Sequence, residues 1–209
     1  MKAFDIITEA DARTLEIGSS VTLKPGGHIT PLAADTLKAR RVTVLSGVVD
    51  ASLEGLAPAA AVRSVAIGSD HSGVSLKSAL RDHLRQRGVS VLDVGTNGPD
   101  PVDYPDIAAQ VARLVARREV DAGIVIDGAG IGSAIAANKI RGVRAAMCVN
   151  KTLARYSREH NGANVLALGA TLVSTEEAHA IVDTWVATPM SEARYIRRLA
   201  KIRALEQTQ

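Results

Sequence analysis

From residue 65 to the C-terminus, short aliphatic runs alternate with segments of helical periodicity, and this alternation constrains the fold more than any other feature. Short aliphatic runs are typical of strands buried on both faces of a parallel sheet. Strands that alternate with helices indicate right-handed βαβ units, and hence a Rossmann-like three-layer α/β sandwich. The predicted strands are 65–68, 89–94, 123–126, 144–149 and 165–168, and the predicted helices are 74–87, 107–118, 133–139, 152–160, 176–186 and 191–205.

Residues 1–45 have a different pattern and predict a small α/β module that precedes the main domain at 64–209. The stretch 46–63 between them is rich in Ala, Gly and Ser, as a linker would be. The module is too small for a large core of its own, so we expect it to dock on a partner. Its predicted elements are a helix beginning at the capping-box-like Thr8–Asp11, a strand at 21–23, a turn at Pro25–Gly27, a helix at 32–40 after Thr30-Pro31, and a strand at 42–45.

Composition supports this fold and argues against several classes of function. Only five aromatic residues occur among 209, so the core must consist of Ala, Val, Ile and Leu. The formal charge of +3, from 25 basic and 22 acidic residues, is too small to indicate nucleic acid as a partner. One Cys excludes an internal disulfide and argues against a thiolate metal site. With no signal peptide and no long apolar run, we expect a cytoplasmic protein that binds neither metal nor membrane.

Polar segments follow several of the predicted strands. Ligands of open α/β sheets bind beyond the carboxyl ends of the strands, so we expect these segments to form one site. They are Ser69–Gly73, Asp103–Pro105, Asp127–Ser133 and, in the helix after the fourth strand, Ser157–Asn161.

The glycine-rich turn at Gly128–Gly132 is the most informative of these segments. Alternate glycines let successive N–H groups converge into an anion-binding nest, to which the next helix adds the positive end of its dipole. A phosphate or the oxyanion of an enediolate would suit such a nest. The turn is not a dinucleotide fingerprint, because it follows the third strand and its last glycine comes too early for G-x-G-x-x-G. No redox cofactor is expected.

Together these motifs resemble the ribose-5-phosphate isomerase B family, which includes the subunits of galactose-6-phosphate isomerase. The resemblance covers residues 65–206. The matching stretches are Gly68–Gly73, Asp103–Pro105, Gly128–Gly132 with Ile135–Lys139, Ser157–Asn161 and Arg194–Arg198.

The resemblance implies an aldose–ketose isomerase that opens the sugar ring and moves a proton between C1 and C2 through a cis-enediolate, without metal or cofactor. It also implies active sites shared between subunits, in a homodimer or homotetramer. The implied residues are His160 with its partner Asp70 for ring opening, Tyr104 beside the sugar, Asp70 and His71 lining the pocket, Gly128, Ala129, Gly130, Gly132 and Ser133 around the enediolate, Asn161 at the sugar, and Arg194 and Arg198 at the phosphate.

Four positions depart from the family pattern. Asp127 stands where a catalytic Cys is common, Ser133 where another branch has a Glu, Ala129 where Thr is frequent, and Thr171 where an Arg often follows the fifth strand. The simplest interpretation makes Asp127 the base, with burial at a strand end raising its pKa into a useful range. The missing arginine raises the prospect of a different sugar phosphate.

Alternatives remain open at this point. Asp127 would serve equally well as a cap for the nest, the arginines as a solvated basic face, and Cys148 as plain core. Ribose 5-phosphate is the first substrate to consider, followed by another pentose, hexose or tetrose phosphate, whereas a non-catalytic sugar-phosphate sensor is the competing class. Stretches at Ile7–Ala10 and Ile29–Ala34 are loosely similar to the N-termini of some bacterial microcompartment enzymes, which suggests targeting or partner docking.

Overall fold

The computed structural model of the protein describes residues 2–46, 56–59, 61–190 and 193–207. The chain divides into two compact units. The N-terminal unit is Met1–Leu56 with Ser191–Lys201, and the larger unit is Ala57–Met190 with Ile202–Gln209. The predicted linker at 46–63 falls largely outside the described residues, so its boundaries stay a prediction.

The larger unit is built on a five-stranded sheet in which every strand is parallel to its neighbours. The strand order is β5-β4-β6-β8-β7, so β4 and β5 form one side of the sheet, and the chain then crosses to β6, reaches the edge at β7 and returns to place β8 between β6 and β7. The predicted Rossmann-like α/β fold is confirmed. The strands are β4 (Ser64–Ser69), β5 (Ser90–Asp93), β6 (Ala122–Asp127), β7 (Ala145–Met147) and β8 (Val165–Gly169).

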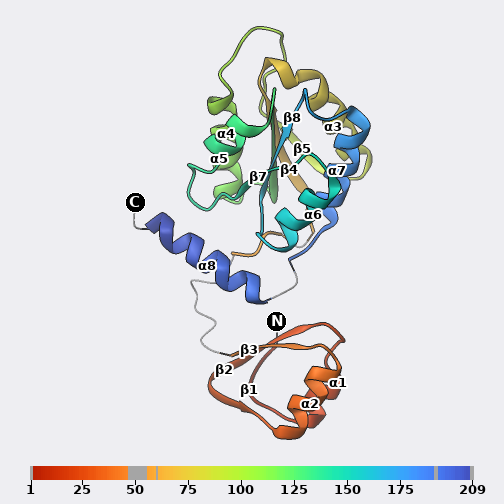
Figure 1. The fold of residues 1–209 in the computed structure, drawn as a ribbon, viewed down its shortest axis with the longest axis vertical. Coiled ribbons are helices and arrows are strands. Elements are labelled where there is room, and N and C mark those ends of the chain that lie inside the picture. Colours follow the sequence, from red (N-terminus) through yellow and green to blue (C-terminus); the bar gives the residue numbers. More distant parts are fainter. Residues whose placement is uncertain (1, 47–55, 60, 191–192, 208–209) are drawn as a thin grey trace. The chain divides into compact units, whose positions relative to one another are not determined.

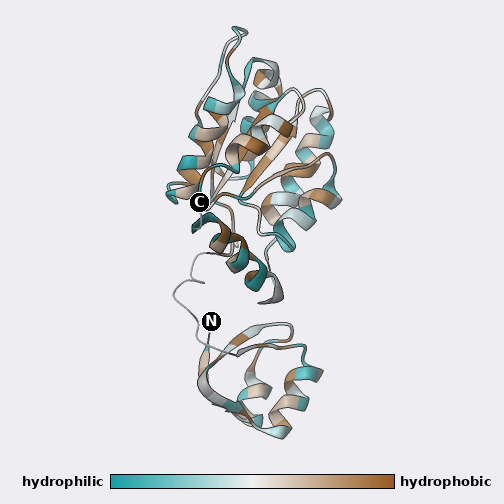
Figure 2. Cartoon of the chain, turned by 60° about the vertical axis from the view of Figure 1, so that its left-hand side comes forward, coloured by the Kyte–Doolittle hydropathy of each residue, from teal (hydrophilic) through white to brown (hydrophobic). Residues whose placement is uncertain are grey.

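Helices cover both faces of this sheet, with α4 and α5 on one side and α3, α6 and α7 on the other (Figure 1). Each face has its own buried cluster of aliphatic side chains. Figure 2 shows this concentration of hydrophobic residues along the strands. The helices are α3 (Val74–Gln86), α4 (Tyr104–Ala116), α5 (Ile131–Ala137), α6 (Lys151–Glu159) and α7 (Thr175–Ala187).

The helices that follow β4 and β6 leave the sheet on opposite faces. After β4 the chain makes a short 3₁₀ helix, η2 (His71–Gly73), and continues into α3, whereas β6 continues into α5. Adjacent strands whose connections diverge in this way create a crevice at their carboxyl ends, the topological switch point of an open sheet. The topology therefore selects the ends of β4 and β6 as the place where a ligand would bind.

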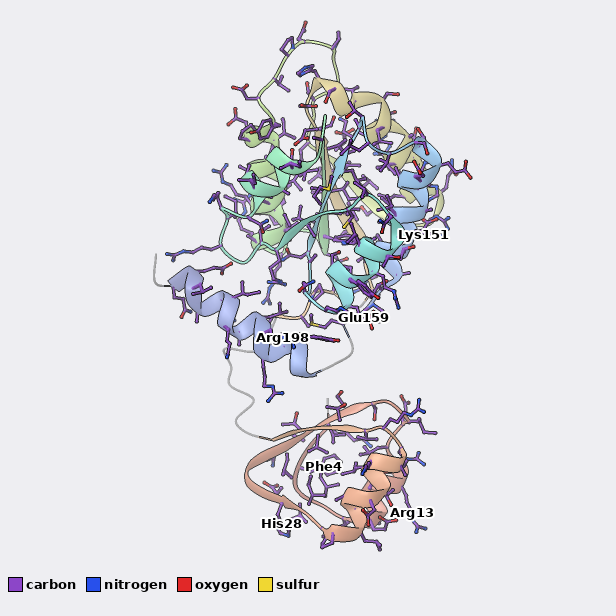
Figure 3. The ribbon with its side chains drawn as sticks, in the orientation of Figure 1. Phe4, Arg13, His28, Lys151, Glu159 and Arg198 are labelled. Atoms are coloured by element: carbon purple, nitrogen blue, oxygen red, sulfur yellow. The ribbon has the colours of Figure 1, made fainter. Side chains whose placement is uncertain are left out.

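The N-terminal unit contains a three-stranded parallel sheet of order β1-β2-β3. The predicted capping box is confirmed, because Thr8 and Asp11 bond each other's backbone at the start of α1. The sequence analysis missed β1, and its predicted turn at Pro25–Gly27 lies inside β2, next to a register shift between Phe4 and Ile6 (Phe4 is labelled in Figure 3). The elements are β1 (Ala3–Ile7), α1 (Glu9–Thr14), β2 (Ser20–Ile29), α2 (Pro31–Ala39) and β3 (Thr43–Ser46).

The last helix, α8, spans Ala193–Gln207. Its final turns lie against the larger unit, where the carboxylate of Glu206 accepts hydrogen bonds of 3.1 Å from the backbone N–H of Gly142. No helix within the described residues is long and apolar enough to cross a membrane.

Candidate active site

The segments that follow β4, β6 and β8 are tied together by backbone hydrogen bonds. The N–H of Asp70 donates to the carbonyl of Ile126 at 3.1 Å, and the N–H of Ala170 donates to the carbonyl of Asp127 at 2.8 Å. The sequence analysis expected polar residues to meet at this edge, and the structure brings Asp70 and Asp127 to adjacent strand ends.

Asp127 lies inside the glycine-rich turn, with its side chain only 5% exposed. Its carboxylate accepts hydrogen bonds from the backbone N–H groups of Ala129 and Ser133, both at 2.8 Å, and from that of Gly130. Gly130 has φ of 76°, and a Cβ there would lie 2.8 Å from the carbonyl carbon of Leu168, so only glycine fits. The turn is therefore folded around the carboxylate at its own start.

These bonds correct the expected pKa of Asp127. Burial acts to raise the pKa, but the hydrogen bonds from Ser133, Gly130 and Ala129 outweigh it and hold the pKa below its ordinary value. The prediction that burial raises this pKa is wrong, because the number of N–H donors that stabilise the charged form decides the sign. Asp127 is ionised at neutral pH.

The same bonds change the expected roles of three neighbours. Ala129 and Gly130 were predicted to offer N–H groups to an enediolate, and Ser133 to contact the substrate. In the structure all three bind Asp127, and Ser133 is buried. No hydrogen bond among the described residues uses the N–H groups of Gly128 and Gly132, so these remain available as oxyanion donors.

Asp70 and His71 open η2 beside the turn. One carboxylate oxygen of Asp70, Oδ1, caps η2 by accepting from the N–H of Ser72 at 2.9 Å and of Gly73 at 3.2 Å. All of the hydrogen bonds described for this side chain use Oδ1, which leaves Oδ2 for a ligand. His71 is exposed, and its Nδ1 accepts from the N–H of Val102 at 3.4 Å.

Tyr104 lies against the glycine-rich turn, as its predicted place beside the substrate requires. It is the first residue of α4, whereas the sequence analysis put it in the loop before that helix. A Cβ added at Gly132 would lie 2.5 Å from Cζ of Tyr104 and 2.9 Å from its hydroxyl oxygen. Glycine at 132 is thus what allows the ring to approach the backbone this closely.

His160 and Asn161 lie at the opposite edge of the sheet. In a parallel βαβ unit the helix runs back against the strands, so α6 begins near their carboxyl ends and ends near their amino ends. Figure 3 labels Lys151 and Glu159 at the two ends of α6. The N–H of Gly123, early in β6, donates to the carbonyl of Asn164, which directly follows the turn after α6.

The expectation that Ser157–Asn161 joins the other segments within one chain is therefore wrong. The turn after α6 lies beside Gly123, whereas Asp127 is at the other end of β6. The four residue steps between Gly123 and Asp127 separate the two ends of the strand by about 13 Å. Asp70 cannot be the partner of His160 in the same chain for the same reason.

At its own edge, the ring of His160 stacks on Tyr156, with centroids 4.7 Å apart, and its Nε2 lies 3.9 Å from a carboxylate oxygen of Glu159. Asn161 donates to the carbonyl of Tyr156 at 3.3 Å and lines a cavity of about 330 Å³ beside β7, which Arg144 also lines.

Comparison with known proteins decides the family. Residues 65–202 match the family model described as Ribose/Galactose Isomerase. Ribose-5-phosphate isomerase B of Escherichia coli (strain K12) is 45% identical over 146 residues, which cover 70% of this chain and 98% of that protein. The chain belongs to the Ribose/Galactose Isomerase family.

Solved structures agree with this assignment. Clostridium thermocellum Ribose-5-Phosphate Isomerase B is 48% identical, with a TM-score of 0.68, over 69% of this chain and 98% of that one. Ribose-5-phosphate Isomerase B from Mycoplasma genitalium, solved with bound ribulose-5-phosphate, is 38% identical with a TM-score of 0.68, over 70% and 97% of the two chains. The larger unit is hereafter called the isomerase unit, and residues 1–56 of the N-terminal unit precede the matched residues.

The two arginines assigned to the phosphate lie on the first half of α8. The side chain of Arg194 lies outside the described residues. Arg198, labelled in Figure 3, is exposed, and its guanidinium lies 5.6 Å from the ring centroid of Tyr195. The phosphate role of both arginines stays a prediction.

Two contributions to this isomerase site were missed by the sequence analysis. Thr171, identified only as a missing arginine, donates its hydroxyl to the carbonyl of Gly128 at 2.7 Å and thereby braces the turn. Lys77, which is buried, bonds Asp93 at 2.5 Å and Asn97 at 2.8 Å, and so holds the loop whose backbone pairs with Ser69. The signal that could have indicated Lys77 was a lysine at a helix position that the apolar periodicity places in the interior.

Among the described residues, no three His, Cys, Asp or Glu side chains are grouped so that they would hold a metal ion. What the crevice offers is an ionised carboxylate, a second carboxylate with one oxygen unused, a phenol and backbone N–H donors. This set can move a proton and stabilise a developing oxyanion.

Asp127→Asn is expected to lower the free energy of unfolding at pH 7 by about 2 kcal/mol, because the amide replaces an ionised acceptor. The folded-state pKa of Asp127 is lowered, so its stabilisation is complete above the unfolded-state pKa of about 3.9 and is lost as the pH falls through the folded value. Urea unfolding of both proteins across the pH range should show a constant difference near neutrality that closes in acid.

Asp82→Asn is the matched control, since Asp82 is an exposed aspartate on α3 whose carboxylate bonds the side chain of its neighbour Arg81. Its effect at pH 7 should be small compared with that of Asp127→Asn, because water screens the exposed pair. A difference between the wild type and Asp127→Asn that persists unchanged at pH 3 would contradict the assignment of the hydrogen bonds to an ionised Asp127.

Proposed function

We propose that the protein interconverts ribose 5-phosphate and ribulose 5-phosphate, an intramolecular aldose–ketose isomerisation. The observation that carries this proposal is the ionised Asp127 held in a glycine-rich turn at the switch point of a sheet of this family. The related Mycoplasma genitalium structure that holds ribulose-5-phosphate supports the choice of substrate.

The proposed reaction has two stages. In the first, an imidazole moves a proton from the C1 hydroxyl to the ring oxygen while the bond from C1 to that oxygen breaks, which gives the open aldose. In the second, a base takes the proton from C2 and the carbonyl oxygen at C1 becomes part of a cis-enediolate. The proton of the C2 hydroxyl then passes to the C1 oxygen, and the base returns its proton at C1, which leaves a carbonyl at C2 and gives the ketose. Backbone N–H groups at Gly128 and Gly132 are the proposed donors to the enediolate oxygens.

Asp127 is the proposed base. An ionised carboxylate is the form that a base requires, and the turn fixes its position without side-chain freedom. Its lowered pKa makes it a weak base in the free protein. The proposed donors to the enediolate, Gly128 and Gly132, are not among the N–H groups that bind Asp127, so a substrate that covers the crevice would raise the basicity of Asp127 by removing water from the carboxylate.

Ring opening is assigned to His160 of a second copy of the chain. His160 and Asp127 lie at opposite edges of one sheet, so a site that uses both needs two chains in a homodimer or homotetramer. The exposed face of α6 supports such a contact, because Leu153 and Tyr156 are 42% and 40% exposed and lie seven and four residues before His160, on the same face of the helix. Arg194 and Arg198 remain the proposed phosphate ligands.

The two stages separate experimentally because ribulose 5-phosphate is acyclic: its C5 hydroxyl carries the phosphate and cannot close a furanose. Exchange of its C1 protons with solvent deuterium needs the base but no ring opening. His160→Gln should therefore lower turnover of ribose 5-phosphate by about 100-fold and leave C1 exchange nearly unchanged, whereas Asp127→Asn should lower both by about 100-fold or more. Proton NMR in D₂O measures both reactions.

Asp127→Cys is the matched variant, since Cys is the residue that the family resemblance puts at this position. It should recover C1 exchange that Asp127→Asn loses, provided that both variants fold. Full exchange in Asp127→Asn would remove Asp127 as the base. Exchange with a hexose or tetrose phosphate but not with ribulose 5-phosphate would change the substrate, and exchange with no sugar phosphate would favour a non-catalytic sensor.

The N-terminal unit is proposed as a docking module of a cytoplasmic enzyme, directed toward a protein partner or a bacterial microcompartment. Its residues 1–56 precede the residues that match the isomerase family and have their own sheet and buried cluster. A separate core in this part of the chain suggests that it adds a contact and no chemistry.

Deletion of residues 1–56 should leave C1 exchange within about threefold of the full chain and change where the protein is found in the cell. Activity is measured on the purified proteins, and distribution by fractionation of the producing bacterium. Unchanged distribution together with an unchanged oligomeric state would remove the docking role.

A further inference from the structure

The segment that carries His160 also contains a buried guanidinium, and the proposed reaction does not use it. Arg158 is 0% exposed, although arginine is almost never fully buried unless it is paired. Burial, with a smaller contribution from Arg144, lowers the pKa of Arg158 to about 10, so the side chain stays charged at neutral pH. Such a charge is costly to bury and calls for a reason.

The acceptors of this guanidinium are backbone carbonyls. Nη1 donates to Ala163 at 2.9 Å, Nη2 to Ala59 at 2.8 Å and Nε to Thr188 at 3.3 Å, while the guanidinium lies 4.9 Å from the ring centroid of Trp185. No carboxylate among the described residues pairs with it. One planar group thus joins the turn after α6, the chain before β4 and the end of α7.

The turn after α6 holds both residues that the proposed mechanism assigns to the partner's site. Its backbone ends the helix in an αL arrangement, in which Gly162, with φ of 55°, donates its N–H to the carbonyl of Arg158 at 3.1 Å. The N–H of Ala163 donates to the carbonyl of Ser157 at 2.8 Å. The guanidinium then fixes the carbonyl of Ala163 from the protein interior. His160 and Asn161 lie between the two fixed points.

We infer that Arg158 is a positioning residue for ring opening: its guanidinium sets the turn that presents His160 and Asn161 to the neighbouring active site. This inference rests on the proposed function. The planar guanidinium suits Arg158 to this role, because N–H donors on its three nitrogen atoms reach three separate carbonyls at once. A lysine has one nitrogen and cannot span them.

The role of Arg158 predicts a selective defect. Arg158→Lys should lower kcat for ribose 5-phosphate by about 10- to 100-fold, as expected when a reacting group is displaced by about 1 Å, with KM changed less than threefold. C1 exchange on ribulose 5-phosphate should stay within about threefold of wild type, because that stage does not use His160. Arg158→Met should show the same selectivity with a larger loss of turnover.

Arg117→Lys is the control, since Arg117 is an exposed arginine that pairs with Glu119 at the end of α4. It should leave both reactions unchanged. Each variant is first checked by thermal unfolding and gel filtration, and Arg158→Lys carries the test if Arg158→Met does not fold.

Two results would overturn the inference: wild-type kcat in a folded Arg158→Lys, or equal losses of turnover and C1 exchange in that variant. The second would mean a general structural role. Failure of the proposed function is distinguishable, because wild-type protein would then show neither reaction.

Discussion

The direction of the strands constrains everything else in the isomerase unit. All five strands run parallel. A residue at the end of a strand therefore lies at the carboxyl ends of the strands, and a residue that ends a helix lies at their amino ends. Asp70 and Asp127 belong to the first kind, and His160 and Asn161 to the second. Chemistry that needs both kinds cannot be completed within one chain, and the proposal of a shared site follows from this separation as much as from the family.

The glycine-rich turn illustrates how a loop and its anion determine each other. An empty nest of N–H groups attracts an anion. Here the carboxylate of Asp127 fills the nest, and Thr171 braces it through the carbonyl of Gly128. The donors, in turn, hold the carboxylate ionised. The N–H groups that Asp127 leaves unused, those of Gly128 and Gly132, are therefore the ones proposed for the substrate oxyanion.

Much of the fold was predictable because periodicity and turn chemistry are local properties. The aliphatic runs of β4, β6 and β8 and the capping box at Thr8 were predicted from a few neighbouring residues each. The strand β1 was missed, since Asp5 interrupts its short apolar run. The continuation of β2 through Pro25–Gly27 was hidden because its pairing depends on a register shift in another strand.

The errors at the site arose from features that are not local. The sign of the pKa shift of Asp127 depends on how many N–H groups the turn folds back onto it, which the identity of the residues does not reveal. The position of His160 was misjudged because its segment was grouped with the strand before it, although the length of α6 carries it to the far edge. The role of Arg158 depends on carbonyls 99 and 30 residues away in the sequence.

A mixed-chain experiment tests the shared site most directly. Chains carrying Asp127→Asn and chains carrying His160→Gln are each expected to turn over ribose 5-phosphate poorly on their own. When the two are unfolded, mixed in equal amounts and refolded together, half of the dimers contain both chains, and each of these has one site with both native residues. A site shared between two chains predicts recovery of about a quarter of wild-type turnover. Mixed dimers that are demonstrably formed yet no more active than either parent would contradict it.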